Sequence, residues 1–153
     1  ADLRSQSKNF IKWCLVRMEN YLQDITDPNS TYSYMDSFKS FQIEHIIPYN
    51  FYRNLPEDEQ ESYKDKINNI GNLTLLEKSL NARLQDEDYT QKREIYAESK
   101  SFLTKSMHSH INDGNSLYVT MYSNLNIYEE FDDVQIKNRN RLLTSILLKA
   151  VFS

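Results

Sequence analysis

The stretch FQIEHIIPYNF, residues 41–51, places a glutamate and a histidine side by side inside an apolar run. Its β-branched and aromatic residues predict a short strand over residues 41–47. Pro48 cannot donate to a strand ladder, so the strand is expected to end near it. A strand that only packs does not need Glu44 or His45, and the chain has only three histidines. The pair is therefore a candidate for chemistry.

A second short strand and a helix are expected later in the chain. In NLTLL, residues 72–76, the apolar side chains alternate, and this predicts a strand. The segment EKSLNARLQ, residues 77–85, is predicted to be a helix that begins near Glu77 or Ser79.

The rest of the chain is expected to be mainly helical, because two glycines and three prolines leave little material for turns. Pro56 followed by three acidic residues predicts a helix start, and Gly71 is the expected end of that helix. The other predicted elements are a helix near residues 10–25, a polar turn over 26–37, a helix over 90–105 and an amphipathic helix near 134–151. The apolar stripe of the first helix comprises Phe10, Cys14, Met18, Tyr21 and Ile25, widened by Ile11, Leu15 and Leu22. The predicted fold class is mainly α with a small β-hairpin.

Length and composition predict one soluble globular domain over residues 1–153. The chain is 39% apolar and 26% charged, and a chain of this length buries roughly 68–70% of the surface that its unfolded form exposes. No apolar run has the length of a bilayer span, so no membrane partner is expected. The single cysteine, Cys14, excludes an internal disulfide and fits a reducing compartment.

The net charge of −4 argues mildly against a nucleic-acid-binding protein. The charge is uneven, however. PEDEQES, residues 56–62, carries four acids and no base, whereas residues 135–149 carry four bases and no acid. A local basic face therefore remains possible.

Three short motifs follow one another in an informative order: E44-H45-I46-I47-P48, then G71-N72-L73, then L80-N81-A82-R83. This order resembles the HNH, or ββα-metal, nucleases. Within them it is most similar to the C-terminal nuclease domain of GmrSD-type restriction enzymes, which attack modified DNA. Lys92 and the spacing of Phe131, Ile136 and Arg139 extend the resemblance to about residues 38–150.

The resemblance implies a metal-dependent DNA endonuclease, with a ββα-metal HNH core at about residues 41–88 embedded in a helical domain. His45 is then the general base, since an imidazole with a pKa of about 6.5 accepts a proton from water at neutral pH. Glu44 and Asn81 are the implied ligands of one divalent ion, Mg²⁺ or Mn²⁺, which prefers carboxylate and amide oxygens. Asn72 and Lys92 complete the implied catalytic set: Asn72 braces the strands or orients His45, and Lys92 contacts the phosphate.

Several of these residues also have a purely structural interpretation. Neighbours on a regular strand face opposite sides, so Glu44 and His45 can serve one phosphate only where the strand ends or twists. Asn72 follows Gly71 and is also suited to shaping a turn. Lys92 is equally consistent with a solvated helix face.

The basic residues Arg83, Lys137 and Arg141 are the candidates for DNA contact. Lys137 and Arg141 are four positions apart and share one face of the predicted C-terminal helix. The alternative is that this basic stripe, together with Arg139 and Lys149, is only the hydrated face of the helix.

The motif set departs from the HNH name in one respect. No third histidine follows Asn81 within the expected helix, so the pattern is H–N–N, as in many members of that family. His108 and His110 lack carboxylates or cysteines at metal-ligand spacing, and they are expected to be surface histidines.

The function expected from the resemblance is that of an endonuclease or nickase acting on double-stranded DNA, as the effector domain of a bacterial anti-phage or restriction system. The domain is expected to form the C-terminal part of a longer cytoplasmic protein that carries an N-terminal sensor or NTPase domain. One alternative is a catalytically silent module of the same fold that binds DNA or a partner. Another is a small helical interaction domain, in which the motif order is a coincidence.

Overall fold

The computed structural model describes residues 6–26, 38–84, 87–109 and 127–152. Its elements are α1 (Gln6–Thr26), β1 (Phe41–His45), α3 (Glu57–Lys64), β2 (Leu73–Glu77), α4 (Lys78–Asn81), α5 (Tyr89–Tyr96), α6 (Phe102–Lys105) and α8 (Asp133–Phe152), with the 3₁₀ helices η1 (Phe51–Asn54) and η2 (Ile70–Asn72). The predicted class, mainly α with a small β-hairpin, is confirmed. Residues 27–37 of the predicted polar turn lie outside the described residues.

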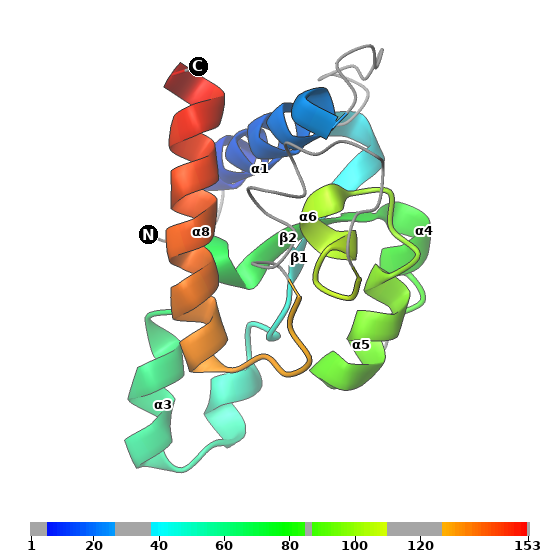
Figure 1. Cartoon of the computed structure of the whole chain (residues 1–153). Helices are drawn as coiled ribbons and strands as arrows, with labels where there is room; N and C mark the ends of the chain where they lie inside the picture. The colour runs from blue at the N-terminus through cyan, green and yellow to red at the C-terminus, as the bar shows by residue number, and fades with distance from the viewer. Residues whose placement is uncertain (1–5, 27–37, 85–86, 110–126, 153) are drawn as a thin grey trace.

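The two predicted strands form one antiparallel pair at the centre of the molecule (Figure 1). Glu44 faces Thr74 across the pair, and His45 faces Leu73. β1 ends at His45, and the backbone N–H of Ile46 still donates to the carbonyl of Asn72 at 2.9 Å. The strand therefore ends at the Glu-His pair, two residues before the predicted end at Ile47 and three residues before Pro48.

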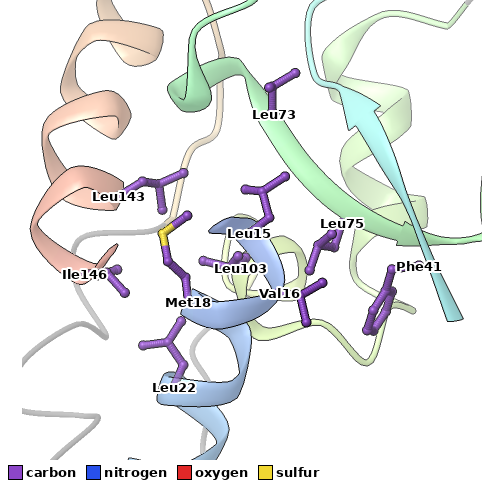
Figure 2. Packing of buried hydrophobic residues seen from close by; sticks show 10 residues of the cluster. All are labelled: Leu15, Val16, Met18, Leu22, Phe41, Leu73, Leu75, Leu103, Leu143 and Ile146. Carbon is purple, nitrogen blue, oxygen red and sulfur yellow. The ribbon is translucent and has the colours of Figure 1, made fainter. Parts of the chain in front are cut away.

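Helices cover both faces of the hairpin. Figure 1 shows α1 and α8 on one side of it and α4 and α5 on the other. On the α1 and α8 side lies one buried cluster, drawn in Figure 2, which comprises Leu15, Val16, Met18, Leu22, Phe41, Leu73, Leu75, Leu103, Leu143 and Ile146. A second cluster comprises Ile46, Ile47, Ile67, Leu76, Leu80, Tyr96, Met107, Phe131 and Ile136. Because successive residues of a strand point to opposite faces, Leu75 and Leu76 of β2 belong to different clusters.

Three helices differ from the sequence prediction, and the one predicted over residues 77–85 is only the short α4, Lys78–Asn81. The helix that begins after Pro56 ends at Lys64, not near Gly71, and Gly71 lies inside the 3₁₀ turn η2. The helix predicted over 90–105 is two helices, α5 and α6. Its interruption contains serine hydroxyls that bond outside the helix: the Oγ of Ser99 donates to Glu77 at 2.6 Å. Such side-chain bonds compete with helical backbone bonds.

Both terminal helices were predicted correctly, with one exception in the apolar stripe. Phe10 of α1 is 62% exposed and stacks on Trp13, with ring centroids 5.9 Å apart. Most of the other stripe residues are buried or pack against the first cluster. α8 packs along α1, and the Nη2 of Arg17 donates to the carbonyl of Ala150 at 2.9 Å. Among the described helices, none is long and apolar enough to cross a bilayer.

Candidate active site

His45 lies half-buried at the last position of β1, with its ring held by an asparagine. Its Nε2 is 3.0 Å from the Oδ1 of Asn68, in the turn between α3 and η2. An amide oxygen only accepts, so Nε2 carries the ring proton in this pair. The Nδ1 of His45 then keeps the lone pair that a general base requires.

The surroundings keep this imidazole neutral. Burial, the largest cause, lowers the pKa of His45, and the positive charge of Lys92 lowers it further. The hydrogen bond to Asn68 opposes these effects. Because the pKa falls below its ordinary value of 6.5, His45 is unprotonated at neutral pH and is able to accept a proton.

Glu44 engages a different element from its neighbour. The hydroxyl of Tyr96 donates to its Oε2 at 3.0 Å, and the Nζ of Lys92 lies 3.4 Å from the same oxygen. The carboxylate is buried, and this burial raises the pKa of Glu44, against the opposing charge of Lys92. Glu44 therefore contacts α5, whereas His45 contacts the turn before η2, as opposite faces of a strand require.

Lys92 is buried and ties α5 to the end of β1. Its Nζ donates to the carbonyls of His45 at 3.0 Å and Ile46 at 3.3 Å, in addition to its ion pair with Glu44. A solvated helix face is thereby excluded for Lys92. The structure gives its ammonium a role in fixing the backbone next to His45.

Asn72 is fully buried and makes three side-chain hydrogen bonds to the backbone. Its Oδ1 accepts from the N–H of Ile47 at 2.9 Å, and its Nδ2 donates to the carbonyls of Ile47 at 3.0 Å and Ile67 at 2.8 Å. These bonds join the segment after His45 to the segment before Asn68. Asn72 thus holds two segments: the backbone that follows His45, and the backbone that precedes Asn68, the residue bonded to the His45 ring. Its side chain has no access to solvent.

Asn81 lies at the end of α4, beside the other face of β1. Its Nδ2 donates to the Oε1 of Gln42 at 2.8 Å. Gln42 and Glu44 are two positions apart on the same strand, so both side chains leave the same face. Gln42, Asn68 and Tyr96 are contacts that sequence reasoning missed, because a lone polar residue or tyrosine carries no spacing signal.

The oxygen atoms on the Gln42 and Glu44 face of β1 are the candidate ligands for a divalent cation. Among the described residues there is no group of three or more His, Cys, Asp or Glu side chains that could hold a metal. The face does offer the two oxygen types that Mg²⁺ prefers, a carboxylate and an amide carbonyl. Tyr96 and Lys92 both contact the Oε2 of Glu44, so these two contacts do not involve its Oε1. Asn81 donates from its NH₂ group to Gln42, so that bond does not involve its Oδ1. In chemical type, though not by any measured separation, these two oxygens are ones that a hard cation prefers.

The candidate DNA-contacting residues are on the surface. Arg83 is exposed and makes a two-pronged pair with Glu98, at 2.8 and 2.9 Å. Lys137 and Arg141 are exposed on α8. Arg139, between them, is fully buried and belongs neither to a basic stripe nor to a hydrated face, which corrects that part of the sequence prediction.

His108 is half-buried rather than fully at the surface, with its Nε2 3.4 Å from the Oε2 of Glu94. His110 lies outside the described residues. No described residue links His108 to the surroundings of His45 through a hydrogen bond.

The first strand ends at His45, whose ring is hydrogen-bonded to Asn68, and the short helix that carries Asn81 packs beside the strand pair. This arrangement is consistent with a nuclease domain. The family described as "GmrSD restriction endonucleases, C-terminal domain" matches residues 1–146. The chain therefore belongs to this family of restriction endonuclease domains. No curated protein and no solved structure shows significant similarity to the chain.

Proposed function

We propose that this domain hydrolyses phosphodiester bonds in double-stranded DNA as a metal-dependent HNH endonuclease, with His45 as the general base. The observation that carries the proposal is the state of His45. Its Nε2 pairs with the Oδ1 of Asn68 and its pKa is lowered by burial, so in the neutral ring the lone pair is on Nδ1. Membership of a restriction endonuclease family supports DNA as the substrate.

In this mechanism the Nδ1 of His45 takes the proton of the attacking water, and Asn68 stabilises the imidazolium that forms. General-base help of this kind is typically worth about 10²–10⁴-fold in rate. Glu44 and Asn81 would hold one Mg²⁺ or Mn²⁺ through their oxygens on the other face of β1, so the phosphate would have to bridge the end of the strand at His45 to reach both groups. When bound, such an ion supplies charge neutralisation for the phosphate and for the leaving oxygen.

The buried polar residues keep this arrangement in place. Asn72 fixes the backbone on both sides of the site, and Lys92 fixes the carbonyls of His45 and Ile46. Preorganised groups of this kind avoid the cost of reorganisation during the reaction. In the proposed mechanism Lys92 therefore acts on the backbone, and its charge also keeps His45 unprotonated.

The exposed basic residues are proposed to bind the DNA backbone. Arg83, Lys137 and Arg141 present guanidinium and ammonium groups to solvent, where contacts with phosphate position the duplex without reading its sequence. One active site cuts one strand, so a monomer nicks. We propose that the domain is the effector of a cytoplasmic bacterial restriction or anti-phage protein and that an N-terminal sensor or NTPase domain delivers it to DNA.

A plasmid assay tests the catalytic proposal. Supercoiled plasmid is incubated with the protein and Mg²⁺ or Mn²⁺, with EDTA as the metal-free control. Nicked circles that require metal and disappear with His45→Ala are expected. His108→Ala is the matched control, because His108 is the other described histidine and its side chain pairs with Glu94 of α5. Equal nicking by His45→Ala and wild type would contradict the assignment.

A second candidate function is a binding module that does not cut. It is favoured by one observation: the ammonium of Lys92 already neutralises Glu44, the carboxylate proposed to hold the metal. This alternative predicts DNA binding that persists without metal, with no nicked product at any metal concentration.

A further inference from the structure

The helix α8 meets the catalytic hairpin at one short turn, Gly71–Leu73. The Nη1 of Arg139 donates to the carbonyls of Gly71 at 3.1 Å and Leu73 at 2.6 Å, on either side of Asn72. The Oδ1 of Asn140 accepts from the N–H of Gly71 at 3.2 Å. Three hydrogen bonds from two adjacent residues of α8 thus hold the backbone around Asn72.

Gly71 allows this contact because it has no side chain. A Cβ at this position would lie 2.2 Å from the carbonyl oxygen of Ile136 and 2.6 Å from the backbone nitrogen of Asn140. Both atoms belong to the backbone of α8, which has no room to yield. The turn and the helix are therefore in direct backbone contact.

Asn72 carries this contact on to the two supports of His45. Its carbonyl accepts from the N–H of Ile46, and its side chain bonds to Ile47, so the two residues after His45 are held. Its Nδ2 also donates to the carbonyl of Ile67, the residue before Asn68. A continuous path of hydrogen bonds and adjacent residues therefore leads from α8 to the backbone and to the ring partner of His45.

Arg139 is an unusual residue for a purely structural role. It is fully buried, and burial lowers its pKa to about 10, so it remains protonated at neutral pH. Among the described residues no carboxylate pairs with it, and its Nε and Nη2 have no hydrogen-bond partner. Burial of a charge without an ion pair lowers the stability of a fold. Stability alone therefore does not explain why Arg139 is buried against the turn, where it donates to two carbonyls.

We propose that Arg139 and Asn140 are positioning residues for His45, acting through Gly71 and Asn72 to fix the imidazole. This inference rests on the proposed role of His45 as the base. It assigns to α8 a part in the reaction although none of its described residues hydrogen-bonds to His45. Loosening the contact of Arg139 and Asn140 with the turn, without displacing the exposed Lys137 and Arg141, is expected to lower turnover and to leave substrate binding unchanged.

The test uses the whole chain with four variants: Arg139→Met, Arg139→Lys, Asn140→Ala and the control Asn138→Ala. Asn138 is exposed on the same helix and has no assigned role. Plasmid nicking gives kcat and KM, and the ¹⁵N spectrum of the imidazoles reports the tautomer of His45 independently of activity. Arg139→Lys keeps a donor for the two carbonyls and serves as the conservative rescue.

Arg139→Met and Asn140→Ala are expected to lower kcat by about 10-fold or more with KM changed by less than about 2-fold, since a small misplacement of a catalytic group is costly. Both are also expected to convert the single Nε2–H tautomer of His45 into a mixture. Arg139→Lys recovers part of each effect, and Asn138→Ala resembles wild type.

Folded Arg139→Met and Asn140→Ala with wild-type kcat and the wild-type imidazole spectrum would overturn the proposal. If Arg139→Met does not fold, Asn140→Ala decides alone, because it removes only one part-buried hydrogen bond. If wild type itself does not cut DNA, the proposed function has failed, and the imidazole spectra still decide whether α8 positions His45.

Discussion

Replacing Asn72 by aspartate changes one chemical group, the NH₂ that donates to the carbonyls of Ile47 and Ile67. The Oδ1 keeps its bond to the N–H of Ile47, but the second oxygen now faces two buried carbonyls. Each buried acceptor that loses its donor costs about 1–3 kcal/mol, so the ionised variant loses about 2–6 kcal/mol of unfolding free energy. Protonation of the introduced carboxyl restores one donor and recovers about half of this loss.

The cost therefore depends on pH with a defined sign. Burial and the facing carbonyls raise the folded-state pKa of the introduced carboxyl above its unfolded value near ~3.9. The folded variant then binds the proton more tightly than the unfolded chain. The deficit relative to wild type is smallest below the unfolded pKa and grows as pH rises through the folded pKa.

Urea unfolding of wild type and Asn72→Asp at about pH 5 and about pH 8 measures this difference. We expect a deficit that is larger at the higher pH by about 1–3 kcal/mol, the value of one recovered hydrogen bond. Asn138→Asp, on the exposed face of α8, is the matched control and is expected to show little change at either pH. A deficit that does not vary with pH, or a variant as stable as wild type at about pH 8, would refute the buried brace.

Three further outcomes follow from the described contacts. The acid limb of the pH profile of kcat/KM is expected at a pKa below the ordinary 6.5 of histidine, because burial lowers the pKa of His45; a limb above 6.5 in a steady-state pH series would contradict this. Lys92→Met leaves Glu44 buried without its cation and is expected to lower the free energy of unfolding in urea by about 3–5 kcal/mol. The double variant with Glu44→Gln is expected to recover part of this loss, and no recovery would argue against the ion pair. Glu19→Ala removes the acceptor of the Ser101 hydroxyl and of two N–H groups at the start of α6. A thermal melt is expected to show a loss of about 2–4 kcal/mol of unfolding free energy, whereas Glu61→Ala, at an exposed position, is expected to show almost none.

The hairpin and the terminal helices were predictable because their signals are local and repeated. The β-branched run ending at Pro48 and the alternation in NLTLL each predict a strand, and the amphipathic pattern after Asp133 predicts a helix. The break between α5 and α6 was not predictable from that pattern. In the sequence, Ser99 and Ser101 do not indicate a helix break. The break depends on their hydrogen bonds to Glu77 and Glu19, and both acids are distant in sequence.

The candidate site was predictable only as a set of residues, because motif order names them but does not orient them. The sequence identified His45, Glu44, Asn72, Asn81 and Lys92 as candidates. It did not indicate that Glu44 and Lys92 pair in the interior, nor that Asn72 is without solvent contact. Burial of a charged residue depends on its tertiary partners, and these are not encoded by spacing.

Direct contact between the turn at Gly71 and α8 also has a consequence for protein synthesis. Arg139 follows Leu73, the first residue of β2, by 66 positions. Ribosomes add roughly 5–20 residues per second, so the hairpin emerges several seconds before the helix that fixes it. A nascent or prematurely terminated chain that carries all the candidate catalytic side chains still lacks the contact with α8. On the proposed role of α8, such incomplete translation products are expected to be inactive until the last helix has been made.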